Sequence, residues 1–194
     1  MGRWEPNARG RLEQAALELY VERGYDETTV AEIAKRAGLT ERTFFRHYAD
    51  KREVLFGGAG VLHDLFVDAV AAAPADAAPI DAIAAALDAA AGMFQDRREF
   101  ARRRQGVITA NPELQERELI KLASLSAAIA GALRLRGVAE PGASLAGEAG
   151  IAVFKVAFDR WINQPDQSDQ AEQRDMAQFV RESLAELKVV TAGV

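Results

Sequence analysis

The stretch TTVAEIAKRAGLTERTFFRHYADK, residues 28–51, contains two short helical patterns separated by a glycine. In the first pattern, Thr29 and Glu32 have the Thr-x-x-Glu spacing of a capping box. In such a box the threonine hydroxyl accepts a hydrogen bond from the backbone three residues later, and the glutamate carboxylate reaches back to the cap. We therefore expect a short helix that starts at Thr29. Gly38 is the residue type that ends a helix in a left-handed conformation.

A second short helix is expected directly after this glycine. Thr40 is a good N-cap residue, and Phe44 and Tyr48 follow at i, i+4 spacing, which places both on the face toward the core. Two short helices about one tight turn predict a helix-turn-helix. The other side chains of the second helix then flank or occupy its outer face: Glu41, Arg42, Thr43, Phe45, Arg46 and His47.

Charge is unevenly distributed along the chain. The formal net charge is −5, yet residues 35–52 hold six basic and two acidic side chains. A basic cluster of this size is compatible with an ordinary solvated surface and also with a surface that binds nucleic acid. The helix-turn-helix spacing favours the second interpretation, because this motif presents one helix to the major groove of DNA.

The rest of the 194-residue chain also predicts helices, so the expected fold class is all-α. Hydrophobic residues make up 49% of the sequence, enough for a sizeable core, and runs of alternating β-branched residues are missing. A first helix is expected to end at Gly24, and a long helix is expected from Asp50 to Ala73. Further helices are expected at roughly 80–95, 96–106, 112–136, 143–164 and 168–189.

Composition argues against an enzyme and against a metal site. The sequence has no cysteine and two histidines, His47 and His63, without the spacing of metal ligands. The stretch GASLAG lacks the final glycine of a Gly-x-Ser-x-Gly nucleophile motif. We therefore expect no catalytic residue, no metal and no cofactor. The amino terminus lacks the apolar run of a signal peptide, and no segment approaches 18 apolar residues free of charge, which predicts a cytoplasmic protein that does not enter the membrane.

Residues 16–56, ALELYVERGYDETTVAEIAKRAGLTERTFFRHYADKREVLF, resemble the DNA-binding domain of the TetR family of bacterial transcriptional regulators. The similarity includes the Gly-Tyr before the threonines, the Ala-Gly turn and the Phe-x-x-His-Tyr-x-x-Lys ending. It implies a three-helix DNA-binding domain over residues 1–50 and a larger helical ligand-binding and dimerisation bundle over residues 51–194. Residues 101–161 are similar, more loosely, to the C-terminal half of the mycofactocin-regulator-like branch of the family.

The resemblance also implies roles for individual side chains. Phosphate contacts are implied for Thr29, His47 and Lys51, the last in the first turn of the next helix. Base-edge contacts are implied for Glu41, Arg42 and Thr43, and an arginine can hold guanine O6 and N7 with two parallel hydrogen bonds. The complete set of expected DNA-binding residues is Thr29, Thr40, Glu41, Arg42, Thr43, Phe45, Arg46, His47 and Lys51.

Two of these residues leave alternatives open. Glu41 either accepts a hydrogen bond from cytosine N4 or repels phosphates. Phe45 stands where many relatives have a tyrosine whose hydroxyl reaches a phosphate, and a phenyl ring cannot make that bond. Phe45 then contacts either a sugar or a thymine methyl group, and either binding is weaker or Arg46 compensates.

The helix expected at 143–164 has apolar residues on two sides, so one side can face its own core and the other a partner subunit. Together with the last helix it predicts a four-helix interface in a homodimer. A dimer would place two recognition helices about 34 to 36 Å apart, on successive major grooves of a palindromic operator. The alternative is that the last helix only covers its own core. The expected interface residues are Val153, Val156, Arg160, Phe179, Val180, Leu184 and Leu187.

A ligand cavity in the larger domain is the remaining expectation, although the same side chains can equally form solid core. The candidate residues are Leu62, Phe66, Met93, Phe94, Phe100, Arg103, Arg104, Ile108 and Phe158. Such a set predicts a hydrophobic or amphipathic effector whose charged end binds an arginine. The chain is then a repressor that a small molecule releases from its operator. The alternative is a helical adaptor that acts through a protein partner without a small-molecule effector.

Overall fold

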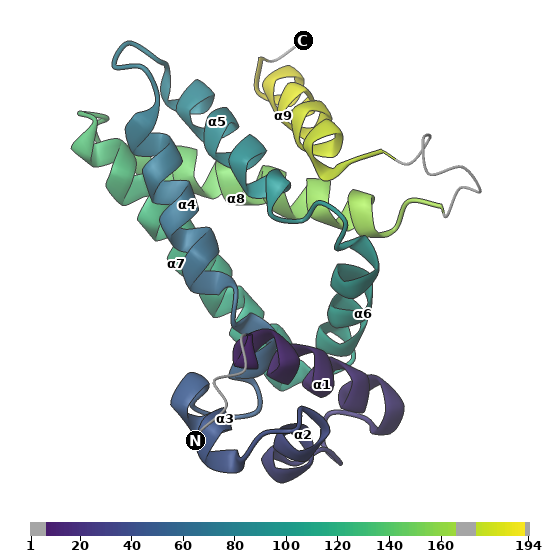
Figure 1. The fold of residues 1–194 in the computed structure, drawn as a ribbon. Coiled ribbons are helices and arrows are strands. Elements are labelled where there is room, and N and C mark those ends of the chain that lie inside the picture. The colour runs from purple at the N-terminus through teal and green to yellow at the C-terminus, as the bar shows by residue number, and fades with distance from the viewer. Residues whose placement is uncertain (1–6, 166–173, 193–194) are drawn as a thin grey trace. The chain divides into compact units, whose positions relative to one another are not determined.

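The structure is a computed structural model, which describes residues 7–165 and 174–192 of the chain (Figure 1). Every regular element within these residues is helical, so the all-α prediction is confirmed. The elements are α1 (Ala8–Arg23), α2 (Val30–Arg36), α3 (Glu41–His47), the 3-10 helix η1 (Glu53–Phe56), α4 (Ala59–Ala72), α5 (Pro79–Gly92), α6 (Arg98–Thr109), α7 (Pro112–Leu135), α8 (Gly142–Ile162) and α9 (Met176–Ala192).

The chain forms two compact units. Unit 1 contains residues 1–59 together with residues 103–119, and unit 2 contains residues 60–102 and 120–194. This grouping differs from a boundary at residue 50, because η1 packs against α1 and the adjoining ends of α6 and α7 belong to the same unit. Contacts between segments that are far apart in the sequence produce the difference. A functional division at residue 50 stays a prediction.

The core of unit 1 lies where α1, α2 and α3 meet. Leu12, Leu17 and Leu19 of α1, Ile33 of α2 and Phe44 of α3 are at most 2% exposed. On α1 the buried residues Leu12, Ala15, Ala16 and Leu19 follow the i, i+3, i+4 and i+7 pattern of an apolar helix face. Burial of one such side chain stabilises the fold by about 1.5–3 kcal/mol.

The turn between α2 and α3 confirms the helix-turn-helix prediction. The Thr29 hydroxyl accepts from the Glu32 backbone N–H, and the Glu32 carboxylate accepts from the Thr29 backbone N–H, which completes the capping box. Gly38 has a φ of 66°, a left-handed conformation that a side chain with a Cβ atom rarely adopts. Thr40 then caps α3 by accepting from the Thr43 backbone N–H at 3.2 Å.

The long helix expected from Asp50 to Ala73 is wrong. The chain instead forms η1, turns at two glycines and enters α4 at Ala59. Gly57 keeps a right-handed helical backbone, and a Cβ atom there would clash with the Glu13 carboxylate and the Tyr48 hydroxyl, so the close approach of these side chains requires a glycine. The Asp50 carboxylate accepts from the backbone N–H of Glu53, and the Glu53 carboxylate pairs with Arg117.

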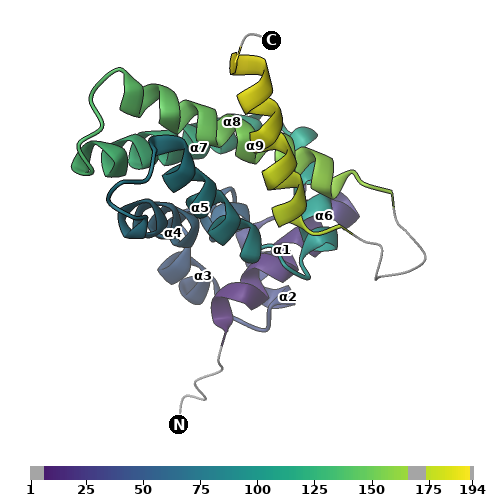
Figure 2. The same cartoon turned by 90° about the horizontal axis from the view of Figure 1, so that it is seen from above.

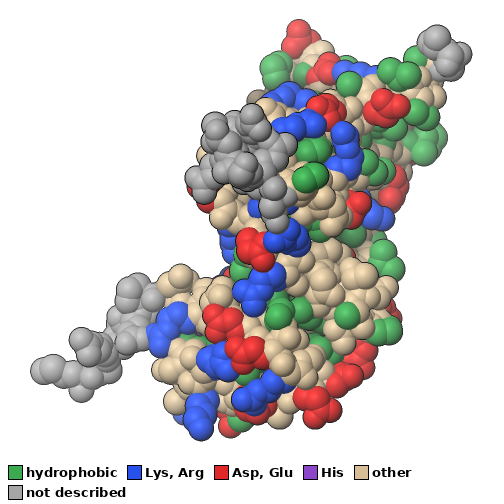
Figure 3. All heavy atoms as spheres, turned by 90° about the vertical axis from the view of Figure 1, so that its right-hand side faces the viewer, with side chains coloured by type: hydrophobic (Ala, Val, Ile, Leu, Met, Phe, Trp, Pro, Cys, Tyr) green, Lys and Arg blue, Asp and Glu red, His purple; other side chains and the backbone are tan. Residues whose placement is uncertain are grey.

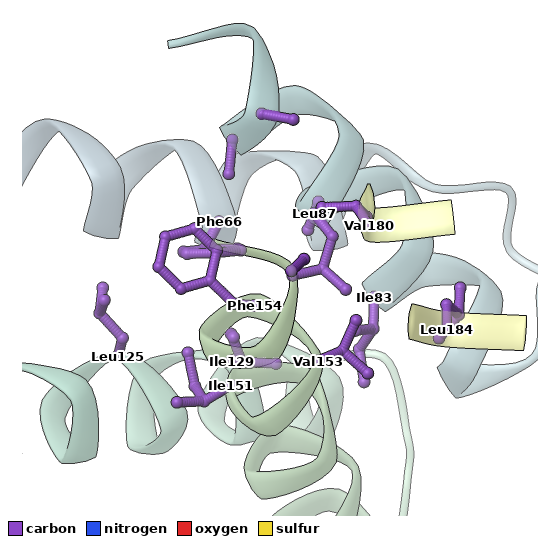
Figure 4. Packing of buried hydrophobic residues seen from close by; sticks show 14 of the residues in the cluster. Phe66, Ile83, Leu87, Leu125, Ile129, Ile151, Val153, Phe154, Val180 and Leu184 are labelled. Atoms are coloured by element: carbon purple, nitrogen blue, oxygen red, sulfur yellow. The ribbon is translucent and has the colours of Figure 1, made fainter. Parts of the chain in front are cut away.

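Unit 2 is built around α5, α8 and α9, which pack against one another (Figure 2). The rings of Phe66 and Phe154 meet edge to face with centroids 5.9 Å apart, and Leu184 reaches the same cluster from α9 (Figure 4). α7 and α8 approach closely at Gly147, where a Cβ atom would lie 2.7 Å from the Ser126 carbonyl oxygen. The apolar faces of these helices therefore form one continuous core.

α9 begins later in the chain than the last helix that the sequence predicts. The last helix was expected at 168–189, yet Arg174 and Asp175 are not helical and α9 begins at Met176; residues 166–173 lie outside the described residues. Residues 53–72 are long and apolar enough, by composition alone, to cross a membrane. That is weak evidence, because core helices of soluble proteins pass the same test, and Asp64 and Asp68 are exposed on this segment.

Candidate DNA-binding surface

The outer face of α3, formed by Glu41, Arg42, Phe45 and Arg46, is the most exposed part of the helix. α3 is oriented by Phe44, which is fully buried in the core of unit 1. Because successive residues of a helix differ by about 100°, the side chains before and after Phe44 must point away from that core. The structure therefore places these four predicted residues together on one surface.

Arg42 and Arg46 form no hydrogen bond or ion pair within the part of the chain that the structure describes. Other arginines of unit 1 are held by carboxylates of the same unit: the pairs are Arg23–Glu32 at 2.9 Å, Arg36–Glu22 at 2.8 Å and Arg52–Asp50 at 2.7 Å. On the face shown in Figure 3, basic and acidic side chains are accordingly interspersed. Two exposed guanidinium groups without a partner are available to bind an external anion or a base edge.

The hydroxyl of Thr29, for which a phosphate contact is expected, already has hydrogen-bond partners on α2. Its hydroxyl accepts from the Glu32 backbone and donates to the Glu32 carboxylate at 2.9 Å. The hydrogen bonds from the Thr29 backbone and hydroxyl hold the pKa of Glu32 below its usual value. A phosphate contact from this hydroxyl would therefore have to replace the bond to the carboxylate.

Lys51 has different partners from those expected. Its ammonium group donates to the backbone carbonyls of Tyr25, Asp26 and Thr28 at 2.9–3.2 Å and lies 4.3 Å from the centre of the Tyr25 ring. All three donors are thus used to close the loop between α1 and α2. Lys51 also precedes η1, which begins two residues later, so it does not lie in the first turn of a helix.

His47 and Thr43 are half-buried at the sides of the outer face. The Nε2 atom of His47 is enclosed and has no hydrogen-bond partner within the described residues. A contact between this histidine and DNA would therefore use Nδ1 or require the ring to turn. The Thr43 hydroxyl lies 3.1 Å from the hydroxyl of Thr40, the residue that caps the helix.

Two arginines that sequence reasoning did not connect with α3 hold the segment that follows it. Arg104 donates to the Leu55 carbonyl at 2.7 Å, pairs with Glu118 at 3.3 Å and lies over the Phe56 ring. Burial lowers the pKa of Arg104. Arg117 forms an ion pair with the Glu53 carboxylate of η1. The contacts of Arg104 with Leu55 and of Arg117 with Glu53 span about fifty or more residues of sequence, so no local pattern indicates them.

The candidates for a ligand cavity are divided between the two units. Arg103, Arg104 and Ile108 belong to unit 1, where Arg104 has the partners described above, and the other six belong to unit 2. Within unit 2, Phe94 and Phe158 are half-buried, with ring centroids 5.5 Å apart, beside the buried Trp161. Phe66 is fully buried, Leu62 and Met93 are half-buried, and Phe100 lies under Arg97. The structure thus gathers aromatic side chains within unit 2.

The predicted interface residues also separate into two groups. Val153, Phe179, Val180 and Leu184 are at most 8% exposed and lie in the core of unit 2, so they offer a partner little area. Leu187 is half-buried, and Arg160 pairs with Glu182 at 2.8 Å. Val156 is 52% exposed. It lies on a stripe of α8 together with Leu145, Ala149 and Ala152, whereas Val153, which was expected on the same side, is buried in the core.

These features place the chain in the class of helix-turn-helix proteins. The second helix of the motif presents arginines that are unpaired within the described residues, and a larger helical unit follows the motif. The family model described as "Bacterial regulatory proteins, tetR family" matches residues 13–56. The model described as "MftR C-terminal domain" matches residues 77–189, more than half of the chain. The chain therefore belongs to the TetR family and has the MftR-type C-terminal domain, as the resemblances in the sequence implied.

Relatives and solved structures agree with this assignment. The HTH-type transcriptional regulator TcmR of Streptomyces glaucescens is 38% identical over 88 residues, which cover 45% of this chain and 39% of that protein. The chain matches only about a third of the length of the curated relatives. FadR from Bacillus subtilis in complex with stearoyl-CoA has a TM-score of 0.62 at 18% identity, over 92% of this chain and 96% of that chain. Thermus thermophilus FadR in complex with lauroyl-CoA has a TM-score of 0.54 at 24% identity, over 92% of both chains. At such identities the two structures show the fold alone.

Proposed function

We propose that this chain is a cytoplasmic, homodimeric transcriptional regulator that binds a palindromic operator through α3. The observation that supports it most directly is the pair of exposed, unpartnered arginines on the outer face of α3. A guanidinium can hold guanine O6 and N7 in the major groove, or a phosphate, with parallel hydrogen bonds. Arg23, Arg36 and Arg52 of the same unit are neutralised by carboxylates, whereas Arg42 and Arg46 keep free donors for DNA within the described residues.

The test is retardation of the DNA upstream of the gene that encodes this chain. We expect the folded protein to bind a palindromic segment of that DNA. Affinity should fall steeply with salt, because each phosphate that is neutralised releases about 0.9 condensed counterions. If a folded dimer retards no such fragment at any salt concentration, the DNA proposal is wrong and an adaptor that acts through a protein partner takes its place.

The exposed stripe of α8 supports the homodimer. Leu145, Ala149, Ala152 and Val156 repeat at intervals of four, three and four residues on the side of α8 opposite its core residues. On α9, Val189 is 57% exposed as well. A helix with apolar residues on two opposite sides is stable in water only when both sides are covered, and a second copy of the chain offers an identical stripe.

Val156→Glu is the variant that tests this interface, with Val61→Glu as its matched control. Both valines are exposed to a similar extent, 52% and 55%, but Val61 lies on α4. We expect Val156→Glu to sediment as a folded monomer with much weaker operator binding, and Val61→Glu to stay a dimer. A wild-type chain that is monomeric at micromolar concentration, or a Val156→Glu variant that still dimerises, would contradict the homodimer.

We further propose a hydrophobic or amphipathic effector that binds unit 2. The half-buried rings of Phe94 and Phe158 support it, since they offer apolar contact area and no hydrogen bonds. The two FadR structures are complexes with acyl-CoA molecules, which are amphipathic. Lauroyl-CoA and stearoyl-CoA are therefore suitable first probes in a thermal-shift screen. A ligand at a hundredfold excess over its Kd stabilises the folded state by about 2.7 kcal/mol.

An effector must satisfy two conditions. It must raise the melting temperature, and it must release the operator, because a ligand shifts a conformational equilibrium only through different affinities for the two states. Phe158→Ala should reduce both effects together. A compound that stabilises the protein without releasing DNA is not the effector, and a screen without any such compound favours regulation through a protein partner.

A further inference from the structure

Phe45 is an aromatic side chain exposed to water on the outer face of α3. Its side chain is 56% exposed, although the neighbouring Phe44 is completely buried. The two rings meet edge to face, with centroids 5.5 Å apart and an interplanar angle of 81°. Such an arrangement is the preferred geometry of aromatic pairs, and it fixes the exposed ring against a side chain of the core. Phe45 therefore presents a rigid apolar surface.

The neighbours of Phe45 on α3 are polar side chains that suit base edges. Arg42 lies three residues before it and Glu41 four residues before it, and residues at these spacings are adjacent on a helix surface. A phenyl ring has no donor or acceptor, so it can make no hydrogen bond to a phosphate oxygen or to the polar edge of a base. What it can contact in a major groove is an apolar group.

The 5-methyl group of thymine is the apolar group on the major-groove edges of the four bases. We infer that Phe45 recognises the 5-methyl group of one pyrimidine in each operator half-site, next to the base pair that Arg42 contacts. This inference rests on the proposed function, because it requires α3 to lie in the major groove. A contact with deoxyribose is the competing arrangement, and it would not depend on the base methyl group.

The chemistry of such a contact has a second consequence. The phenyl ring touches the methyl group and not the O4 or N4 atom beside it, so it does not by itself distinguish thymine from 5-methylcytosine. Cytosine at the same position lacks the methyl group and should be bound less well than 5-methylcytosine. The contact thus makes the protein sensitive to methylation of a cytosine placed at this position.

Uracil interference tests the inference directly. The upstream fragment is amplified with a mixture of dTTP and dUTP and separated into bound and free DNA. Uracil-DNA glycosylase then removes the uracil bases, and hot alkali cleaves the strand at the resulting abasic sites. For the wild-type protein we expect one thymine per half-site at which uracil weakens binding about fourfold, which corresponds to about 0.8 kcal/mol for one buried methyl group. For Phe45→Ala, interference at that thymine should disappear, while the remaining pattern is retained.

Phe45→Leu serves as a control, because leucine keeps an apolar contact and should preserve part of the interference. Synthetic operators with cytosine or 5-methylcytosine at the identified position give a second measurement, and we expect 5-methylcytosine to bind more tightly to the wild type but not to Phe45→Ala. Equal interference in the wild type and Phe45→Ala, or no thymine that responds to uracil, would overturn the inference while DNA binding itself stands. Failure to retard the fragment at all would instead overturn the proposed function.

Discussion

α2 and α3 are both seven-residue helices with a threonine N-cap, and both present arginines to water, but their arginines differ in what surrounds them. Arg36 of α2 pairs with the carboxylates of Glu18 and Glu22 on α1. Arg42 and Arg46 of α3 have no partner within the described residues. The difference arises because α2 packs beside the acidic face of α1, whereas among the described residues no carboxylate pairs with either arginine on the outer face of α3. An arginine that its own fold neutralises has a structural role, and one that it leaves unpaired is available to a ligand.

The largest expected effect comes from removing both unpaired arginines. Arg42→Ala combined with Arg46→Ala should weaken operator binding at least about thirtyfold, since each contact contributes about 1–3 kcal/mol. The melting temperature should hardly change, because the two side chains have no partner among the residues that the structure describes. Fluorescence anisotropy measures the operator affinity, and calorimetry measures the melting temperature.

Arg36→Ala is the matched control for that variant. It removes an equally basic side chain from the neighbouring helix, and it should leave operator affinity within a few-fold of the wild type. If Arg36→Ala weakened binding as strongly as the double variant, internal pairing would not separate structural from DNA-binding arginines, and the comparison between α2 and α3 would fail.

A smaller effect, on stability and not on base preference, is expected at Arg104. Its guanidinium donates to the Leu55 carbonyl and pairs with Glu118, in surroundings dry enough to lower its pKa. Arg104→Met should leave both partners unsatisfied and reduce the free energy of unfolding by about 2–3 kcal/mol. Urea denaturation measures this change in the free energy of unfolding. A strong loss of a single base preference at unchanged stability would show that Arg104 acts on DNA instead.

Lys51 allows the comparison to be sharpened, because the family pattern implies a phosphate contact whereas the structure places its ammonium group on three backbone carbonyls. Lys51→Met should lower the free energy of unfolding by about 1–2 kcal/mol, through the lost hydrogen bonds and the lost contact with the Tyr25 ring. The salt dependence of operator binding should stay the same. A smaller salt slope at unchanged stability would instead show that the lysine leaves its carbonyls and binds a phosphate.

The smallest effect is the pH dependence of the pair between Glu22 and Arg36. The hydrogen bond from Arg36 holds the pKa of Glu22 below its usual value. Because the folded-state pKa is the lower one, this contribution to stability is present above the unfolded value of about 4.3 and is lost as the pH falls through the folded value. The difference in stability between the wild type and Glu22→Gln should be constant from pH 7 to about pH 5 and shrink below about pH 4. A difference that persists at pH 3 would contradict the role of the charge.

Much of unit 1 could be predicted from the sequence because its signals are local. The capping box of Thr29 and Glu32, the left-handed Gly38, the Thr40 cap and the buried Phe44 all formed as expected. Each depends on residues within four or five positions of one another, and such a pattern has the same meaning in any surroundings. The helix-turn-helix and the all-α fold follow from these signals alone.

The tertiary structure decided which of the recognised residues have free functional groups. It broke the helix expected after Asp50, buried Val153 in the core of its own unit, and closed three carbonyls around Lys51. Each outcome depends on segments 20 or more residues apart meeting in space, for which the sequence has no periodic signal. The sequence by itself determined where helices begin, end and bury their apolar faces, since backbone hydrogen bonds and side-chain spacing act locally. Only the tertiary structure decided which charges are neutralised and which stay unpaired, because an ion pair requires two particular groups to come within about 4 Å of each other.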